Sequence, residues 1–231
     1  MKNSEYDKRV FYSESKVAAT YDNFRYEGQS GAYVNNRELA TTISLLPSDG
    51  TILDVPTGTG RLLKRLNRNN FHRVGGDYSE AMLNQIGEKG ISKTRLDAFN
   101  TPFENEMFDV VVSLRFLFHY SDINIFFKEV YRILKPGGVF ICQTYRWSPL
   151  AWDIPVPLMV GGKIHIHSDN KMQKLFYKTG LKVIEQKSIF LFSPFFYKYL
   201  PFIIVKALDI FERIVPDKLK VDAYWKSVKA N

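Results

Sequence analysis

One segment constrains the fold more than any other: residues 52–61, which read ILDVPTGTGR. We expect a short apolar strand, a loop and a helix there, in that order. Gly58 and Gly60 let backbone N–H groups come close to a ligand, which is why such loops occur at nucleotide sites. The segment therefore predicts an α/β domain with a ligand at the end of its first strand.

From residue 50 onward, short apolar strands alternate with helices, as in a parallel sheet covered on both faces. The run Val110–Val112 is typical of a strand that is buried on both faces. A turn is expected at 135–138, because proline and two glycines cannot continue a helix. The expected strands are 51–55, 72–76, 93–97, 108–113, 139–145, 181–190 and 220–229; helices are expected from Arg61, over 79–86, 124–134 and 168–178, and from Pro201.

The length of 231 residues and the 45% hydrophobic content fit one globular domain. Apolar residues recur at helical spacing near the N-terminus, where Gly28 and Gly31 mark a break. We expect a doubly wound, mostly parallel seven-stranded sheet, with an N-terminal helical lid and a C-terminal insertion between the last two strands. The expected parts are a helical cap at 1–48, a core at 50–146, and the insertion and final strands at 147–231.

Composition excludes several classes of protein. Cys142 is the single cysteine, so an internal disulfide is impossible and a Cys/His zinc site is disfavoured. The net charge of 32 − 24 = +8 invites an anionic partner, but the basic residues are dispersed and no nucleic-acid motif accompanies them. The N-terminus has no apolar run, and no uncharged stretch reaches the ~18 residues of a membrane span. We therefore expect a cytoplasmic protein.

Three aspartates end successive predicted strands: Asp54, Asp77 and Asp97. Open α/β sheets bind ligands at this edge, and Asp77 lies near the roughly 20-residue spacing at which an acid accepts from ribose hydroxyls. Asp54 would repel a pyrophosphate but suits a ligand with an ammonium group. The dinucleotide fingerprint is incomplete, because Leu63 stands where the third glycine belongs, and no P-loop exists. The pattern favours a nucleoside that carries an amino acid.

The segments ILDVPTGTGRLL, GGDYSEAML, LDAFNTPFENEMFDVVVS and ILKPGGVFICQTY follow one another along the chain. In this order and spacing, residues 50–145 resemble the class I S-adenosylmethionine-dependent methyltransferases, particularly small-molecule members of the methyltransferase type 11 kind. The resemblance implies a Rossmann-like fold with S-adenosylmethionine as cofactor. One departure is Pro56, which replaces the usual first glycine of the loop and removes one N–H.

The resemblance also implies which residues bind the cofactor. The loop would wrap the methionine part, Asp54 would orient its amino group, and Asp77 would accept from the ribose. Residues 21–26 resemble the lid segment of small-molecule members, although Tyr21 and Phe24 can equally be core anchors. The expected cofactor-binding residues are Tyr21, Arg25, Asp54, Pro56, Thr57, Gly58, Gly60, Asp77, Tyr78, Asp97, Ala98 and Ser113.

Candidates for the chemistry follow the fourth strand. Methyl transfer to a hydroxyl requires alignment and a proton acceptor. His119 can be that base or can be structural. Arg115 can bind an acidic group on the acceptor or pair with a neighbouring acid. His165 and His167 alternate as a metal pair would, but nothing in the sequence completes a site, so we expect no metal and a pocket wall or surface strand.

The acceptor is expected to be a small, apolar or aromatic metabolite, with O-methylation favoured. This expectation rests on the aromatic residues of the last third, which with Arg146 would line the pocket: Trp147, Trp152, Phe195, Phe196 and Tyr199. The alternatives are an RNA methyltransferase and a cofactor-binding module without catalysis. Methylation of DNA amino groups is disfavoured, because residues 113–116 are not an NPPY-like motif.

The aromatic segment 189–205 has three interpretations: core, a homodimer contact, or a wall or surface that meets an apolar acceptor or a membrane. In the helix from Pro201, apolar residues follow the spacing of a buried stripe. These residues are Ile204, Ala207, Leu208, Phe211 and Val215.

Overall fold

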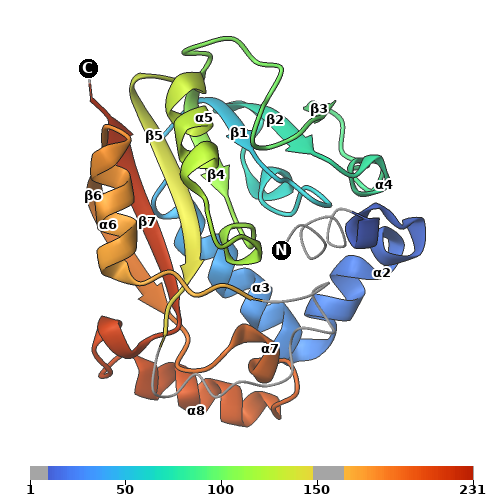
Figure 1. Ribbon diagram of the computed structural model, residues 1–231. Coiled ribbons are helices and arrows are strands. Elements are labelled where there is room, and N and C mark those ends of the chain that lie inside the picture. The colour runs from blue at the N-terminus through green and yellow to red at the C-terminus, as the bar shows by residue number, and fades with distance from the viewer. Residues whose placement is uncertain (1–9, 148–163, 231) are drawn as a thin grey trace.

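The computed structural model describes residues 10–147 and 164–230, and its centre is one seven-stranded sheet (Figure 1). The strand order is β3-β2-β1-β4-β5-β7-β6. Strands β1 to β5 are parallel, whereas β7 is antiparallel to both of its neighbours, β5 and β6. The strands are β1 Gly50–Asp54, β2 Phe71–Asp77, β3 Ile91–Arg95, β4 Phe108–Ser113, β5 Leu134–Tyr145, β6 Leu181–Ile189 and β7 Asp222–Lys229. The mostly parallel, doubly wound sheet with an antiparallel edge is confirmed.

Helices cover both faces of the sheet, so that two apolar cores form. Helices α5 and α6 pack on one face, and α3, α7 and α8 pack on the other (Figure 1). In β4, Val111 belongs to the first core and Val110 and Val112 to the second, as expected for a strand buried on both faces. The helices are α2 Ser15–Tyr26, α3 Gly28–Ile43, α4 Glu80–Leu83, α5 Asn124–Ile133, α6 Asp169–Lys178, α7 Pro194–Tyr197 and α8 Phe202–Glu212, with short 3-10 turns η1 Leu63–Arg65, η2 Leu117–His119 and η4 Asp217–Leu219.

The helix expected from Arg61 does not form beyond the short turn η1. The buried guanidinium of Arg73 donates to the backbone oxygens of Leu63 and Leu66, at 3.0 and 3.3 Å, and so takes carbonyls that a longer helix would use. The expected helix at 79–86 is likewise only α4. The loop after β1 is therefore held by an arginine of β2 instead of by a long helix.

The structure also differs from two predictions that were based on glycines. The expected turn at 135–138 is a bulge within β5, because Leu134 pairs with Phe108 and Val139 pairs with Val110. The chain breaks between α2 and α3 at Glu27 alone, and Gly31 lies inside α3. A Cβ at Gly31 would lie 2.5 Å from the backbone of Tyr26, so this glycine permits the two helices to meet closely.

Helix α8 contradicts the predicted buried stripe. Ile204, Ala207 and Phe211 are exposed, whereas Val205 and Glu212 are buried. The segment before it is mostly core, since Phe190, Leu191 and Tyr197 are buried. Within the described residues, no helix combines the length and the apolar character that crossing a membrane requires.

Candidate active site

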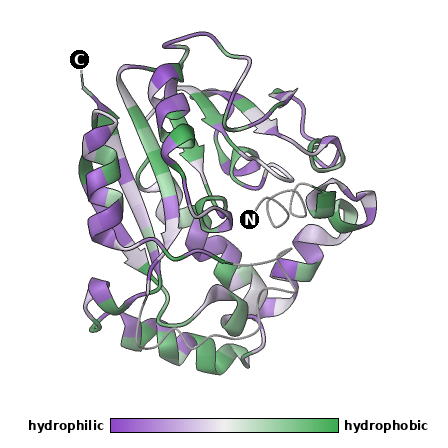
Figure 2. Cartoon of the chain, viewed as in Figure 1, coloured by the Kyte–Doolittle hydropathy of each residue, from purple (hydrophilic) through white to green (hydrophobic). Residues whose placement is uncertain are grey.

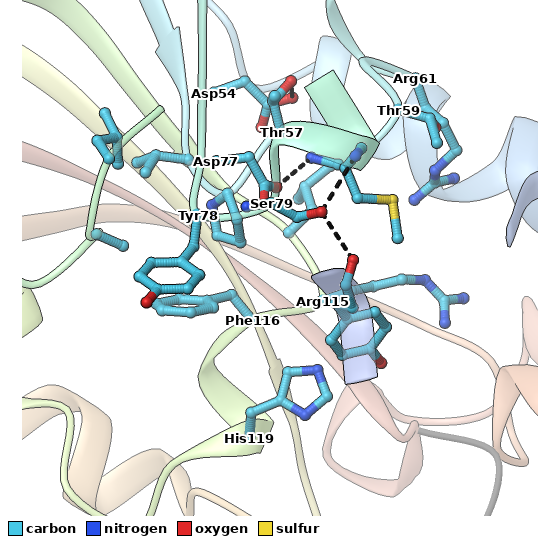
Figure 3. Close-up of a pocket in the computed structure, with 18 of the residues that line it drawn as sticks. Asp54, Thr57, Thr59, Arg61, Asp77, Tyr78, Ser79, Arg115, Phe116 and His119 are labelled. Atoms are coloured by element: carbon cyan, nitrogen blue, oxygen red, sulfur yellow. Dashed lines mark hydrogen bonds between the residues drawn. The ribbon is translucent and has the colours of Figure 1, made fainter. Parts of the chain in front are cut away.

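A cleft of about 1040 Å³ opens at the carboxyl ends of β1, β2 and β4 (Figure 3). The loops that follow these strands line it, together with residues 96–99 after β3. Tyr12 and Tyr21 contribute from the N-terminal region. Five segments that are far apart in the sequence therefore meet at the sheet edge that the aspartates predicted.

The glycine loop after β1 has the backbone shape of a ligand cradle. Gly58 and Gly60 have positive φ angles of 55° and 76°, which favour glycine. A Cβ at Gly58 would meet nothing within 4 Å, so the chain leaves open space at a residue that lines the cleft. Thr57 N donates to Gly76 O at 2.8 Å, which fixes the loop to β2. The replacement of the first glycine by Pro56 leaves this geometry in place.

The carboxyl group of Asp54 is buried, and one of its two oxygens is available to a ligand. Its Oδ2 accepts from the Thr57 hydroxyl at 3.0 Å, while Oδ1 has no hydrogen-bond donor among the described residues. Burial raises its pKa to about 7, although Thr57 and Arg61 act in the opposite direction. Such a group accepts strongly from a cationic donor that enters the cleft.

Asp77 has a second role that the sequence did not indicate. Its two carboxylate oxygens accept from Gly58 N at 2.8 Å and from Ser79 N at 2.9 Å, so this side chain connects the two loops of the cleft. Burial raises its pKa, and these backbone donors partly offset the rise. Each oxygen still has a lone pair for a ligand hydroxyl.

The structure brings most of the predicted cofactor residues together. Tyr21, Asp54, Pro56, Thr57, Gly58, Asp77, Tyr78, Asp97 and Ala98 line the cleft. Tyr78 is exposed, and Asp97 accepts from Phe99 N at 3.0 Å. Gly60 is not a lining residue but shapes the loop through its positive φ.

Besides Gly60, two predicted cofactor residues do not line the cleft. Ser113 is fully buried at the end of β4 and does not line it. Arg25 lines a smaller cavity, where its guanidinium lies 4.9 Å from the ring centroids of both Tyr21 and Phe195. It also donates to the Tyr12 hydroxyl at 3.3 Å. Arg25 thus contacts Tyr12 and Tyr21 of the cleft from the side of the smaller cavity.

Arg115 forms an ion pair with Glu38 of α3. Its Nε donates to Glu38 Oε2 at 3.1 Å and its Nη2 to Oε1, and both side chains are buried. Burial alone would lower the pKa of Arg115, but the Glu38 carboxylate reverses this and holds the pKa well above its usual value. The backbone of Arg115 is left-handed, with φ 53°, and its N–H donates to Gln143 Oε1 at 3.0 Å. The structure thus shows the ion pair that the sequence offered as one alternative, and Arg115 also lines the cleft.

His119 lies on η2, across the cleft from Asp54 in Figure 3. Its ring packs against Phe118 and Tyr12, with centroids 4.3 and 5.6 Å apart. Phe99, Phe116 and Tyr120 form an aromatic cluster beside it, with centroid distances from 4.8 to 5.7 Å. One wall of the cleft is therefore polar and the other mainly aromatic.

The aromatic wall comes from residues that the sequence argument did not select. Trp147 is exposed, Phe195 and Tyr199 line the smaller cavity, Phe196 lines neither cavity, and Trp152 lies outside the described residues. Arg146 binds Asp169 at 2.8 Å and Ser188, so it holds the chain together instead of lining the cleft. The residues missed are Tyr12, Glu38, Arg61, Ser79, Phe99, Phe116 and Tyr120; for Phe116 and Tyr120, their position after β4 was the available signal.

The two alternating histidines do not lie on a free strand face. His167 is buried with Nε2 3.0 Å from Leu117 O, and burial lowers its pKa. His165 N donates to Phe118 O at 2.7 Å. In the part of the chain that the structure describes, no three His, Cys, Asp or Glu side chains gather in a way that could hold a metal ion. This segment supports η2 beneath the aromatic wall.

Comparisons with known proteins agree with this architecture. Residues 53–142 match a family model described as a methyltransferase domain. The chain is 34% identical over 102 residues to the ubiquinone/menaquinone biosynthesis C-methyltransferase UbiE of Desulfotalea psychrophila, which covers 42% of each chain. Residues 53–142 form a methyltransferase domain of the class I S-adenosylmethionine-dependent kind.

Two further comparisons extend the range of relatives of this methyltransferase. It is 29% identical over 149 residues to the tRNA (carboxymethyluridine(34)-5-O)-methyltransferase of Arabidopsis thaliana, covering 58% of this chain and 36% of that protein. The solved structure of an S-adenosylmethionine-dependent methyltransferase from Thermotoga maritima matches with a TM-score of 0.68 at 19% identity, covering 95% and 99% of the two chains. The part of this chain that aligns covers 42% of the Desulfotalea psychrophila protein and 36% of the Arabidopsis thaliana protein, so it spans less than half of the length of each.

The residues of the polar wall fit the cofactor of this family. The unfilled Oδ1 of Asp54 suits an ammonium group, the open space at Gly58 admits the methionine chain, and Asp77 can accept from ribose hydroxyls. Ala98 and Tyr78 offer an apolar edge to a base. When bound, S-adenosylmethionine supplies a methyl group that is activated by a sulfonium.

Proposed function

We propose that this methyltransferase transfers a methyl group from S-adenosylmethionine to a hydroxyl group of a small apolar or aromatic metabolite. The observation that carries the proposal is the contrast between the two walls of one cleft. The polar wall fits the cofactor, and the wall opposite offers aromatic side chains and a single histidine. Similarity to a methyltransferase of quinone biosynthesis supports an aromatic acceptor.

The chain's own residues have three tasks in this proposal. The aromatic wall orients a flat acceptor by stacking, and alignment of this kind provides a large share of catalysis in a displacement. His119, which lines the cleft, accepts the proton of the hydroxyl at a ring nitrogen. The N-terminal segment excludes water, because Ser79 Oγ donates to Tyr12 O at 2.8 Å and Thr59 Oγ1 donates to Asp22 at 2.9 Å.

Methyl-labelled S-adenosylmethionine, incubated with a metabolite and lipid extract and in parallel with bulk tRNA, tests the acceptor class. We expect label in an organic-extractable product. The variant His119→Ala should lower kcat by about 10² to 10⁴ while S-adenosylhomocysteine binds as before. His72→Ala, at an exposed position of β2, is the matched control and should retain full activity. Unchanged kcat in His119→Ala would remove this residue as the base.

RNA methylation is the second candidate, supported by the similarity to a tRNA methyltransferase and by the net charge of +8. Label confined to tRNA, with binding that falls steeply as salt rises, would replace the small-molecule proposal. Tight binding of S-adenosylhomocysteine without label in either fraction would instead support a module that binds the cofactor without catalysis.

A further inference from the structure

Helix α8 packs with an apolar side turned away from the protein. Ile203, Ile210 and Ile214 are 74%, 67% and 77% exposed, and Phe211 is 52% exposed. Figure 2 shows hydrophobic residues along the outer side of this helix, whereas the visible side of α6 is largely hydrophilic. Ordinary surface helices expose a polar face, whereas α8 packs Val205, Phe202 and Leu208 against the core and exposes a second apolar face to solvent.

The exposed apolar residues form one continuous arc. Ile203, Ala207 and Ile210 follow the i, i+4, i+7 spacing of a single helix face, Ile204 and Phe211 lie beside them, and Ile214 follows in the turn after the helix. At one edge of this arc stand Lys206 and Arg213, seven residues apart and both exposed. The surface thus combines a row of aliphatic side chains with a basic border.

The acidic residues of α8 face inward. Asp209 accepts from Arg37 at 2.6 Å and from the Tyr33 hydroxyl at 2.5 Å, and it also pairs with Arg213 at 3.2 Å. Glu212 is buried and pairs with Arg37 at 2.7 Å. Arg37 of α3 and Arg213 together balance these two carboxylates, so the positive charge that remains on the outward side is that of Lys206. The outward charge of the helix is positive.

We propose that the outer face of α8 binds the surface of an anionic lipid bilayer, with the helix lying in the plane of the interface. In-plane helices of this kind have a large apolar face and Lys or Arg at its border. A basic border adds about 1 kcal/mol for each Lys or Arg near an anionic membrane, which corresponds to about fivefold in affinity. The charge also argues against a second copy of the chain, since a symmetric pair of α8 helices would bring the basic borders together.

The proposed membrane contact lies in a different segment from the one that the sequence indicated. The sequence pointed to 189–205, but Phe190, Leu191 and Tyr197 are buried under the sheet. The exposed face begins at Ile203 and ends at Ile214. It does not depend on the methyl acceptor, and it lies on a different side of α3 from the residues of the cleft.

Sedimentation with vesicles tests the proposal on the full chain. Vesicles of phosphatidylcholine alone and of phosphatidylcholine with phosphatidylglycerol separate apolar from electrostatic binding. We expect binding to the anionic vesicles that weakens at high salt. Ile210→Asp should weaken it roughly tenfold or more, because a fully buried aliphatic side chain contributes 1.5–3 kcal/mol. Lys206→Gln should weaken it about fivefold, and Arg213→Gln should weaken it less, because Arg213 also pairs with Asp209.

The matched control is Ile125→Asp, because Ile125 on α5 is 62% exposed and has an exposed Lys128 beside it, but it does not belong to a row of exposed aliphatic side chains. It should bind vesicles like the parent chain. Circular dichroism and S-adenosylhomocysteine binding check that each variant is folded. Equal loss of binding in Ile125→Asp and Ile210→Asp, or no binding of the parent to anionic vesicles, would overturn the proposal. So would a dimer in sedimentation equilibrium that Ile210→Asp converts to a monomer.

Discussion

The two walls of the cleft are stabilised by contacts of different range. On the cofactor wall, Asp54 binds Thr57, and Asp77 binds Gly58 and Ser79, so each contact stays within neighbouring strand–loop units. On the acceptor wall, Arg115 is fixed by Glu38 of α3 and by Gln143 of β5. These contacts of the first wall form once the parallel strands pair, although Arg61 of the same loop also binds Asn35 and Glu38 of α3. The second requires that a helix from another part of the chain docks on the sheet.

The largest expected effect follows from this difference. Glu38→Gln leaves the buried Arg115 guanidinium without its carboxylate, and breaking a buried pair by removing one partner costs about 3–5 kcal/mol. Urea unfolding should show that loss, with the midpoint shifted and the slope unchanged. Glu185→Gln, which removes a partly exposed partner of Lys187 on β6, should change stability by less than ~1 kcal/mol.

A double variant tests the Glu38–Arg115 ion pair in a second way. Glu38→Leu combined with Arg115→Met removes both charges, and it should recover much of the lost stability because an apolar pair often replaces a buried ion pair well. If Glu38→Gln unfolds like the parent chain, the two walls do not differ in the way described. Equal losses in Glu38→Gln and Glu185→Gln would contradict it as well.

This difference also explains what the sequence could predict. The mostly parallel sheet, the glycine loop and three aspartates at strand ends follow from local pattern and from parallel topology, and all three aspartates line the cleft. Glu38 lies 77 residues from Arg115, on a helix with no charge pattern that marks it. The spacing of residues along the chain does not predict an ion pair between segments so far apart. Local sequence signals do not predict how α3 docks on the sheet.

Helix α8 shows the same limit of prediction from local sequence. Its spacing correctly predicted an amphipathic helix, but spacing does not state which face turns inward. Arg37 and Tyr33 of α3 attract Asp209 and Glu212, and this orients an apolar face outward. The helix expected from Arg61 was wrong for a related reason, since a buried arginine of β2 competes for its carbonyls.

The second prediction concerns the cofactor wall. Asp77→Asn keeps the size of the side chain but replaces a charged acceptor with an amide, which weakens the bonds to Gly58 N and to ribose hydroxyls. Calorimetry should show S-adenosylhomocysteine affinity reduced by about 1–3 kcal/mol, while the unfolding free energy changes less than in Glu38→Gln. Asp49→Asn, an exposed position just before β1, is the control and should bind like the parent. Unaltered affinity in Asp77→Asn would remove it from the cofactor site.

The third prediction is a pH dependence. Burial raises the pKa of Asp54 to about 7, so the group is neutral below that pH and ionised above it. Only the carboxylate attracts an ammonium group, and the α-amino group of S-adenosylhomocysteine remains protonated through this range. Affinity should therefore rise with pH, by up to about tenfold per unit below pH 7, and level off above. Calorimetry between pH 5.5 and 7.5 measures it. The slope should vanish in Asp54→Asn and persist in Asp49→Asn.

The smallest effect is expected where the two walls meet. Ser79 caps α4 by accepting from Met82 N at 3.1 Å, and its hydroxyl donates to Tyr12 O at 2.8 Å. Ser79→Ala should lower stability by about 1 kcal/mol through the lost cap, and it should also release the N-terminal segment from the cofactor wall. Hydrogen exchange of residues 10–26 should then speed up. Ser168→Ala removes a similar cap from α6, far from the cleft, and should cost about as much without changing that exchange. If both variants accelerate exchange equally, Ser79 is a helix cap alone, and the contact between the walls depends on Thr59 and Asp22 instead.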